Sequence, residues 1–217
     1  MSDSDTLLVC SAEKTPEKYA DWLVALSRNG SEWRETHRVQ TAGIGAISCA
    51  LSDSRALIGY GGDVDNSPYM ELFRVESGPR IARLHRIHVT EQYYSFYATC
   101  TNDTLVAMSY PNSDNSVRLH RLRGDRLEEL ARIQLKSPCY LLWLTDRLLV
   151  AERGIETHTD AVIELEVSDT RLERRSELIA TSKNIMGSRL CAVNDELAIY
   201  DDESKDILLY SLLSNQS

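Results

Sequence analysis

The chain has 217 residues, of which 42% are hydrophobic and 26% are charged, a composition typical of a folded domain and not of a disordered chain. Its formal net charge of −9 argues against a general binder of nucleic acid or of anionic membranes, because phosphate groups are bound by basic surfaces. The sequence shows no stretch of about 18 apolar residues, so it predicts no membrane-spanning helix. It also shows no basic and apolar leader, so it predicts no secretion.

Short apolar segments begin near the amino terminus. The first unit, residues 5–41, contains such segments at 6–12, 22–26 and 33–40. Asn29-Gly30 separates the last two, and this dipeptide is a strong hairpin signal because both residues accept a positive φ. We therefore expect three short strands in this unit.

The same pattern continues through the next two units. The second unit, residues 45–90, offers four segments, at 46–51, 56–60, 69–75 and 81–89. The third unit, residues 93–136, begins with an aromatic segment at 94–100 and continues with three more strands within 104–135. Turn-forming Asn, Asp, Gly and Pro residues lie between the segments.

Two further units, residues 139–180 and 187–213, complete the chain. In the fourth unit the segment 162–167 alternates, with Ile163, Leu165 and Val167 on one face and Glu164 and Glu166 on the other. A period of two with opposite polarity predicts a half-buried strand.

The units repeat at a measurable period. The leucine after the first turn recurs as Leu57, Leu105, Leu148 and Leu197, at intervals of 48, 43 and 49 residues. Four short strands every 40–50 residues resemble the blades of a WD40-like β-propeller, although the Gly-His and Trp-Asp dipeptides of that family are missing. The resemblance implies an all-β propeller of four-stranded antiparallel blades, with residues 1–217 as one propeller domain or a propeller fragment.

Counting the predicted strands gives eighteen, because the first and last units have three each. This number predicts an incomplete propeller of about four to five blades, which needs another chain or segment to complete the ring. A rival interpretation places Leu127, Leu130 and Ile133 on one helix face and predicts an α+β fold, but spacing of three alone is a poor helical stripe.

The resemblance also sorts the charged residues. The loops between second and third strands would share one rim, and the candidate partner-binding carboxylates there are Asp63, Asp65, Asp114, Asp160, Asp201 and Asp202. The outer strands and their turns would form a basic wall of Arg80, Arg83, Arg86, Arg121, Arg123, Arg126, Arg132, Arg171, Arg174 and Arg175. An acidic rim is expected to bind a basic segment of another protein. The alternative is that Asp and Asn occur there because they form turns.

No motif predicts catalysis. The chain has no G-x-S-x-G nucleophile elbow and no phosphate-binding glycine loop, and the EF-hand pattern fails after Asp63-x-Asp65 because Pro68 and Arg74 replace the required Gly and Glu. Among the histidines, we expect His85, His88 and His120 to be solvated, since they lie among arginines in outer or third strands.

The five cysteines lie far apart and form no CxxC motif or Cys/His cluster, so we expect reduced thiols and no metal site. These observations predict a cytoplasmic or nuclear protein without a cofactor. The predicted function is a non-enzymatic protein-interaction scaffold, as a subunit or part of a larger assembly. The alternative is a propeller hydrolase or a sugar-binding lectin that uses rim-loop carboxylates and aromatic residues.

Overall fold

The computed structural model describes residues 6–14, 19–41, 44–50, 55–62, 69–76, 80–91, 93, 95–100, 104–144, 147–153, 160–168, 170–181, 190–193, 196–200 and 206–211. These residues form eighteen β-strands in five sheets of three or four strands, and no helix occurs among them. In this part of the chain there is accordingly no helix long and apolar enough to cross a membrane. The all-β prediction is confirmed.

The chain divides into two compact units. The first comprises Met1–Gln92, Ala98–Thr104 and Leu122–Leu127, and the second comprises Tyr93–Tyr97, Leu105–Arg121 and Glu128–Ser217. The sheets are numbered in chain order. Sheets 1 and 2, formed by strands within residues 6–88, belong to the first unit, whereas most of sheet 3 (strands within residues 95–134) and sheets 4 and 5 (strands within residues 138–211) belong to the second. The prediction of a single domain over residues 1–217 stays a prediction.

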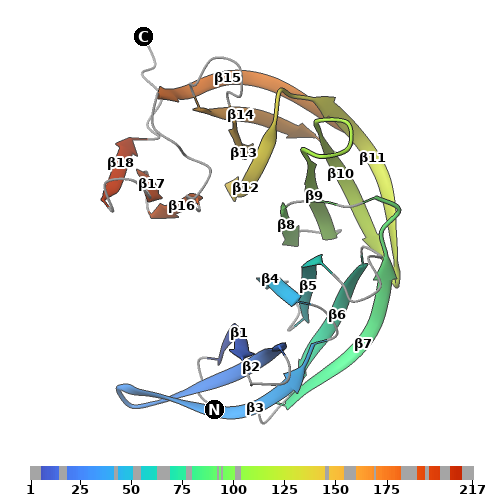
Figure 1. Ribbon diagram of the computed structural model, residues 1–217, viewed down its shortest axis with the longest axis vertical. Helices are drawn as coiled ribbons and strands as arrows, with labels where there is room; N and C mark the ends of the chain where they lie inside the picture. The colour runs from blue at the N-terminus through green and yellow to red at the C-terminus, as the bar shows by residue number, and fades with distance from the viewer. Residues whose placement is uncertain are drawn as a thin grey trace. The chain divides into compact units, whose positions relative to one another are not determined.

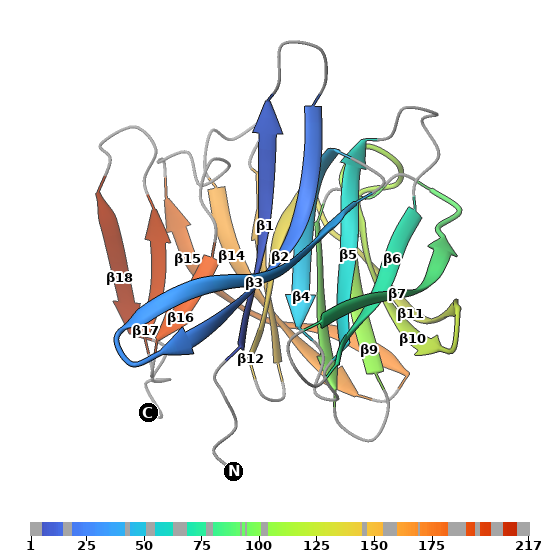
Figure 2. The same cartoon turned by 90° about the horizontal axis from the view of Figure 1, so that it is seen from below.

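The first unit contains two sheets whose strands follow chain order. Sheet 1 consists of β1 (Thr6–Lys14), β2 (Tyr19–Asn29) and β3 (Glu32–Gln40), and β1 and β2 lie antiparallel side by side in Figure 2. Sheet 2 consists of β4 (Ile44–Ala50), β5 (Arg55–Gly62), β6 (Tyr69–Glu76) and β7 (Arg80–His88). The two sheets share a core formed by Leu23, Ala25, Ala56, Ile58, Tyr69, Phe73 and Ile81.

Sheet 3 consists of β8 (Ser95–Cys100), β9 (Thr104–Tyr110), β10 (Ser116–Arg123) and β11 (Arg126–Gln134). Sheet 4 consists of β12 (Pro138–Leu144), β13 (Arg147–Glu152), β14 (Asp160–Ser168) and β15 (Arg171–Thr181). Sheet 5 consists of β16 (Leu190–Val193), β17 (Glu196–Tyr200) and β18 (Ile207–Ser211). The grouping of three, four, four, four and three strands confirms the strand count expected from the repeat.

Sheet 4 lies between sheets 3 and 5 (Figure 1) and packs on both of its faces. Leu148 and Ile163 pack against Val117 and Leu119 of sheet 3, whereas residues on the other face, such as Val162, pack against sheet 5. Such face-to-face stacking of short sheets removes apolar surface from water on both sides of the central sheet.

Residues 126–134 form the strand β11, as the repeat predicts, so the rival helix through Leu127, Leu130 and Ile133 does not occur and the α+β alternative fails. One prediction about the strands is wrong. The strand β14 is not half-buried along its length, because Glu164 is buried together with Ile163 and Leu165. The second face of β14 is covered because another sheet packs against sheet 4 there.

Two hairpins turn at glycine residues. The β2–β3 hairpin turns after Asn29 at Gly30 (φ 63°), as the Asn-Gly signal predicts, and the β10–β11 hairpin turns at Gly124 (φ 62°). A Cβ at either glycine would meet nothing within 4 Å, so the positive φ alone favours glycine at these positions.

The turn at Gly124 provides a test of this explanation. We expect Gly124→Ala to lower the free energy of unfolding by about 1 kcal/mol, because a left-handed φ strains an alanine. Gly124→Asn should cost less, since asparagine tolerates this region. Urea unfolding at pH 7 measures both variants, and equal losses would contradict the backbone explanation.

Candidate functional site

The sequence-predicted rim carboxylates are placed as follows. Asp63, Asp65, Asp201 and Asp202 lie outside the described residues. Asp160 is the first residue of β14 and is buried, whereas Asp114 lies in the β9–β10 loop and is partly exposed. Neither described residue is a freely exposed rim carboxylate, and their partner-binding role stays a prediction.

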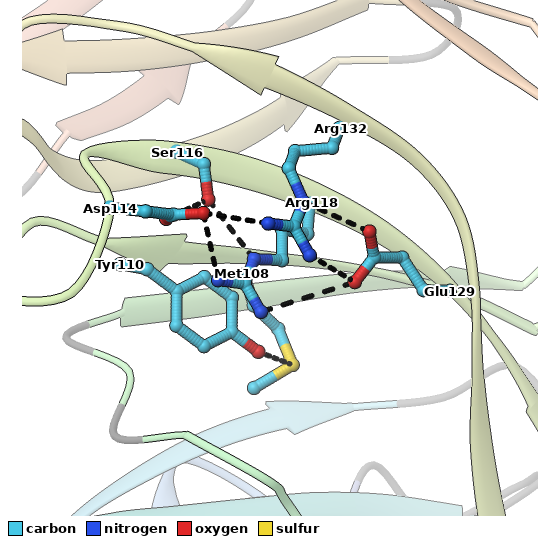
Figure 3. Close-up of polar contacts among 7 residues, drawn as sticks. All are labelled: Met108, Tyr110, Asp114, Ser116, Arg118, Glu129 and Arg132. Atoms are coloured by element: carbon cyan, nitrogen blue, oxygen red, sulfur yellow. Dashed lines mark hydrogen bonds and ion pairs between the residues drawn. The ribbon is translucent and has the colours of Figure 1, made fainter.

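Asp114 takes part in a polar cluster within sheet 3 (Figure 3). Its Oδ2 atom lies 3.0 Å from Nη2 of Arg118 and 2.8 Å from Nη1 of Arg132, and its Oδ1 atom accepts a hydrogen bond from the Ser116 hydroxyl. Burial acts to raise the pKa of Asp114, but the Ser116 hydrogen bond and the two guanidinium groups outweigh it and hold the pKa below its usual range.

Arg118 is the centre of this cluster, and its side chain is only 3% exposed. Its guanidinium carbon lies 4.0 Å from the centroid of the Tyr110 ring, and its Nε atom donates to the Ser116 hydroxyl at 3.0 Å. A second carboxylate, that of Glu129 on β11, places its Oε2 atom 3.9 Å from Nη1 of Arg118. The buried cation is therefore neutralised by carboxylates and covered by an aromatic face.

Glu129 and Arg132 close the cluster on its exposed side. Nε and Nη2 of Arg132 donate to the two carboxylate oxygens of Glu129 at 3.0 and 3.1 Å, a bidentate pair. Behind the ring, the Tyr110 hydroxyl donates to the sulfur of Met108 at 3.5 Å (Figure 3). Because these residues come from β9, β10, β11 and one loop, the cluster connects three of the four strands of sheet 3.

The loop that carries Asp114 is itself fixed by backbone contacts. The amides of Ser113 and Asn115 donate to the carbonyl oxygen of Tyr110 at 3.4 and 3.0 Å, and Asn115 has a φ of 54°. Asparagine adopts this left-handed conformation more readily than most residues. The nitrogen of the Asn115 side-chain amide can donate to the carbonyl oxygens of Pro111 and Lys136.

This loop is linked to the β11–β12 connection and to the end of β13. The Leu135 amide donates to the Asn115 carbonyl oxygen at 2.8 Å, the Lys136 amide donates to the Glu152 carboxylate, and the Arg153 amide donates to the Ser137 carbonyl oxygen at 3.0 Å. We call residues 110–116, 135–138 and 152–153 the loop edge. Hydrogen bonds between these segments hold them in place, so the loop edge presents a fixed surface.

A buried charge recurs on the third strand of each four-stranded sheet. In sheet 2, Glu71 on β6 is fully buried and lies 2.9 Å from Nε of Arg83 on β7. In sheet 4, Glu164 on β14 lies 3.1 Å from Nη1 of Arg147 and accepts a hydrogen bond from Ser176. Burial acts to raise the pKa of Glu164, but the Ser176 and Arg147 hydrogen bonds outweigh it and lower the pKa. With Arg118 in sheet 3, each of the four-stranded sheets contains such a pair.

Sequence reasoning did not predict the burial of these charges, and it placed Glu164 on the polar face of its strand. Each buried charge stands between apolar neighbours on its strand, as in Met70-Glu71-Leu72 and Val117-Arg118-Leu119. This pattern does not identify a buried charge by itself, because Glu166 also lies between apolar residues and is exposed. The basic wall was predicted instead, because arginines are frequent on the outer strands.

The outer strands do expose their arginines, but much of the charge is neutralised locally. Ion pairs join Arg38 to Glu35 on β3, Arg132 to Glu129 on β11, and Arg174 to Glu177 on β15. The strand β7 differs, since Arg80–His88 includes three arginines, two histidines and no carboxylate. One of these arginines, Arg83, pairs with Glu71 of the neighbouring strand.

The three histidines that the sequence analysis expects to be solvated divide into two groups. His85 and His88 are exposed, as expected, but His120 on β10 is buried, so that prediction is wrong. Neither ring nitrogen of His120 has a hydrogen-bond partner among the described residues. Burial lowers the pKa of His120 to about 4, with Glu129 opposing the shift and the guanidinium groups of Arg118 and Arg132 adding to it.

The described cysteine side chains, Cys10, Cys139 and Cys191, form no disulfide, and Cys191 is exposed. Burial raises the pKa of the Cys139 thiol to about 11. Within the described ranges, no group of three or more His, Cys, Asp or Glu side chains is placed to hold a metal ion. The aspartates of the failed EF-hand pattern lie outside those ranges.

Comparison with known proteins identifies a fold relative but no family. No protein-family model matches the chain, and no curated protein matches it. The chain is similar to the crystal structure of a Lactobacillus plantarum protein that was a structural-genomics target, with a TM-score of 0.59 and 12% sequence identity. The match covers 97% of this chain and 68% of that one, and at this identity the likeness shows the fold alone.

The ion-pair cluster leads to a stability prediction. We expect Arg118→Ala to lower the free energy of unfolding by about 3 kcal/mol, because it leaves the partly buried carboxylates of Asp114 and Glu129 without their central cation. Arg126→Ala is the matched control: its side chain is 88% exposed, and it should change the free energy by less than about 0.5 kcal/mol. Similar losses in the two variants, measured by urea unfolding, would contradict this role.

His120 leads to a pH prediction. The unfolded chain binds a proton at His120 near pH 6.5, whereas the folded chain binds it only near pH 4, so protonation favours the unfolded state in this interval. Stability should therefore be lost as the pH falls from 6.5 to 4, by about 3 kcal/mol from this group. His120→Leu should remove that part of the pH dependence in urea unfolding, and His88→Leu, at an exposed histidine, should not. Identical pH profiles for wild type and His120→Leu would disprove the assignment.

Proposed function

We propose that the chain is a β-propeller module that acts as a non-enzymatic protein-binding scaffold. The finer fold assignment is supported by the order of the sheets, each of which follows chain order, and by the cores shared between sheets 1 and 2, 3 and 4, and 4 and 5. The structural likeness over 97% of the chain is consistent with it. A propeller presents loops on a rigid scaffold, which suits the binding of another protein.

The observation that carries the binding role is the loop edge, whose β9–β10 loop joins the second and third strands of sheet 3, as the acidic segments 63–68 and 201–206 join those of sheets 2 and 5. Its loops are fixed by the Leu135–Asn115, Lys136–Glu152 and Arg153–Ser137 hydrogen bonds. Exposed polar residues, including Asn112, Ser113 and Lys136, stand on this fixed backbone. A surface that is ordered before binding loses less conformational entropy when a partner docks.

Two of the six predicted rim carboxylates are less suited to partner binding, because Asp114 is paired internally and Asp160 is buried. Asp114 already pairs with two arginines, so it has little charge to offer a partner. The proposal therefore assigns partner binding to the two remaining acidic loops, with Asp63 and Asp65 in one and Asp201 and Asp202 in the other. The partner is a protein with a basic segment, attracted and oriented by these carboxylates.

Charge reversal tests the proposal loop by loop. The tagged chain should recover a stoichiometric protein partner in quantitative affinity purification, and the partner should decrease about tenfold or more with Asp63→Lys/Asp65→Lys or with Asp201→Lys/Asp202→Lys, because repulsion replaces attraction. Glu32→Lys/Glu173→Lys is the matched control, with the same charge change on exposed outer strands, and should retain it. A chain that recovers no partner, or whose partner is unaffected by both loop reversals, would refute the proposal.

A further inference from the structure

The strand β18 departs from the burial pattern of the third strands of the four-stranded sheets. In the four-stranded sheets the first five residues of β6, β10 and β14 are all buried. In β18 the exposure alternates, and Ile207 and Leu209 are 67% and 61% exposed. These are the two most exposed large apolar side chains among the described residues.

The pairing of the strands explains the difference. Each of β6, β10 and β14 is hydrogen-bonded on its outer side to a fourth strand, namely β7, β11 and β15. Within the described residues, β18 is hydrogen-bonded to β17 alone, so it is an edge strand of sheet 5 (Figure 1). An apolar edge strand is a template for pairing with another chain.

The two faces of β18 have different surroundings. Tyr210 pairs with Leu197 and packs into the core shared with sheet 4. On the opposite face Leu209 pairs with Ala198, which in turn pairs with Cys191, an exposed residue. These three residues and Ile207 form an apolar ladder at the edge of sheet 5, which we call the open ladder.

We propose that the edge of β18 binds an extended segment of another protein that alternates apolar and basic residues and adds antiparallel to β18. This inference rests on the proposed protein-binding function and names the class of partner. Main-chain hydrogen bonds to the edge would supply affinity, and alternate apolar side chains would extend the open ladder beyond Leu209.

The basic character of the segment follows from the charges around β18. Asp206, exposed, precedes Ile207 directly, and Glu196, also exposed, lies opposite Ser211 at the other end of the strand. A carboxylate thus lies at each end of β18, and the strand itself carries no charge. The chain contains a related strand, because β7 pairs with the third strand of its own sheet and consists of five basic and four apolar residues, although these do not alternate strictly.

The test uses the intact chain and a synthetic, fluorescein-labelled peptide of nine residues in which arginine alternates with isoleucine. We expect saturable binding by fluorescence anisotropy, together with slower hydrogen exchange of the amides of residues 207–211. Leu209→Asp should weaken binding about tenfold or more, because a carboxylate would be buried against the apolar ladder. Leu178→Asp, at another exposed leucine, on β15, is the matched control and should bind as wild type does.

Two further comparisons examine the sequence pattern of the segment. A peptide with the same nine residues but with its apolar residues grouped at one end should bind about tenfold more weakly, because alternation is lost. Asp206→Lys should weaken binding of the alternating peptide at low salt and strengthen binding of a variant with its arginines replaced by glutamate. Equal binding of the alternating and grouped peptides would overturn the inference.

Other outcomes would also overturn it. Binding that Leu209→Asp leaves unchanged, or that leaves exchange at residues 207–211 unaltered, would place the peptide elsewhere. A dimer of the chain that Leu209→Asp dissociates in sedimentation would make a second copy the occupant. If the peptide fails to bind but the acidic-loop reversals still release a protein partner, only this inference fails; if the partner is also unaffected, the proposed function fails as well.

Discussion

The structure depends on an ion pair at a buried charge on the third strand of each four-stranded sheet. Glu71 pairs with Arg83, Arg118 with Asp114 and Glu129, and Glu164 with Arg147. A charge buried within a sheet has lost its contact with water, so it needs a partner on a neighbouring strand or in an adjoining loop. These pairs favour one strand register, since a slip of one residue would turn the charge to the other face.

In sheet 3 the same constraint reaches the loops. The pairing of Arg118 with Asp114 holds the β9–β10 loop, and Asn115 of that loop accepts a hydrogen bond from the β11–β12 connection. The interior of the sheet and the order of its loop edge are therefore coupled. A scaffold of this kind can present a fixed surface to a partner without a catalytic group, which is the basis of the proposed function. The edge of β18 differs because no described strand covers it.

The success and failure of sequence prediction follow from how local each signal is. Turn signals such as Asn29-Gly30 and period-two alternation predicted the strands and their grouping into five sheets, because both act between residues close in sequence. The rival helix through Leu127 was a real ambiguity of this segment, because arginine and glutamate favour helices but also suit an exposed outer strand, which is what the segment forms. Four of the six rim carboxylates lie outside the described residues, and Asp114 forms internal ion pairs that loop composition does not reveal.

The sequence by itself determined the all-β class, the number of strands and the positions of the hairpins, because these depend on side-chain alternation and on backbone preferences at turns. Only the tertiary structure decided which charges are buried, that burial lowers the pKa of His120, and that Leu209 remains exposed while Leu119 is covered. Burial depends on sheets and strands that are distant in the chain. Two residues with the same local pattern can therefore have opposite surroundings.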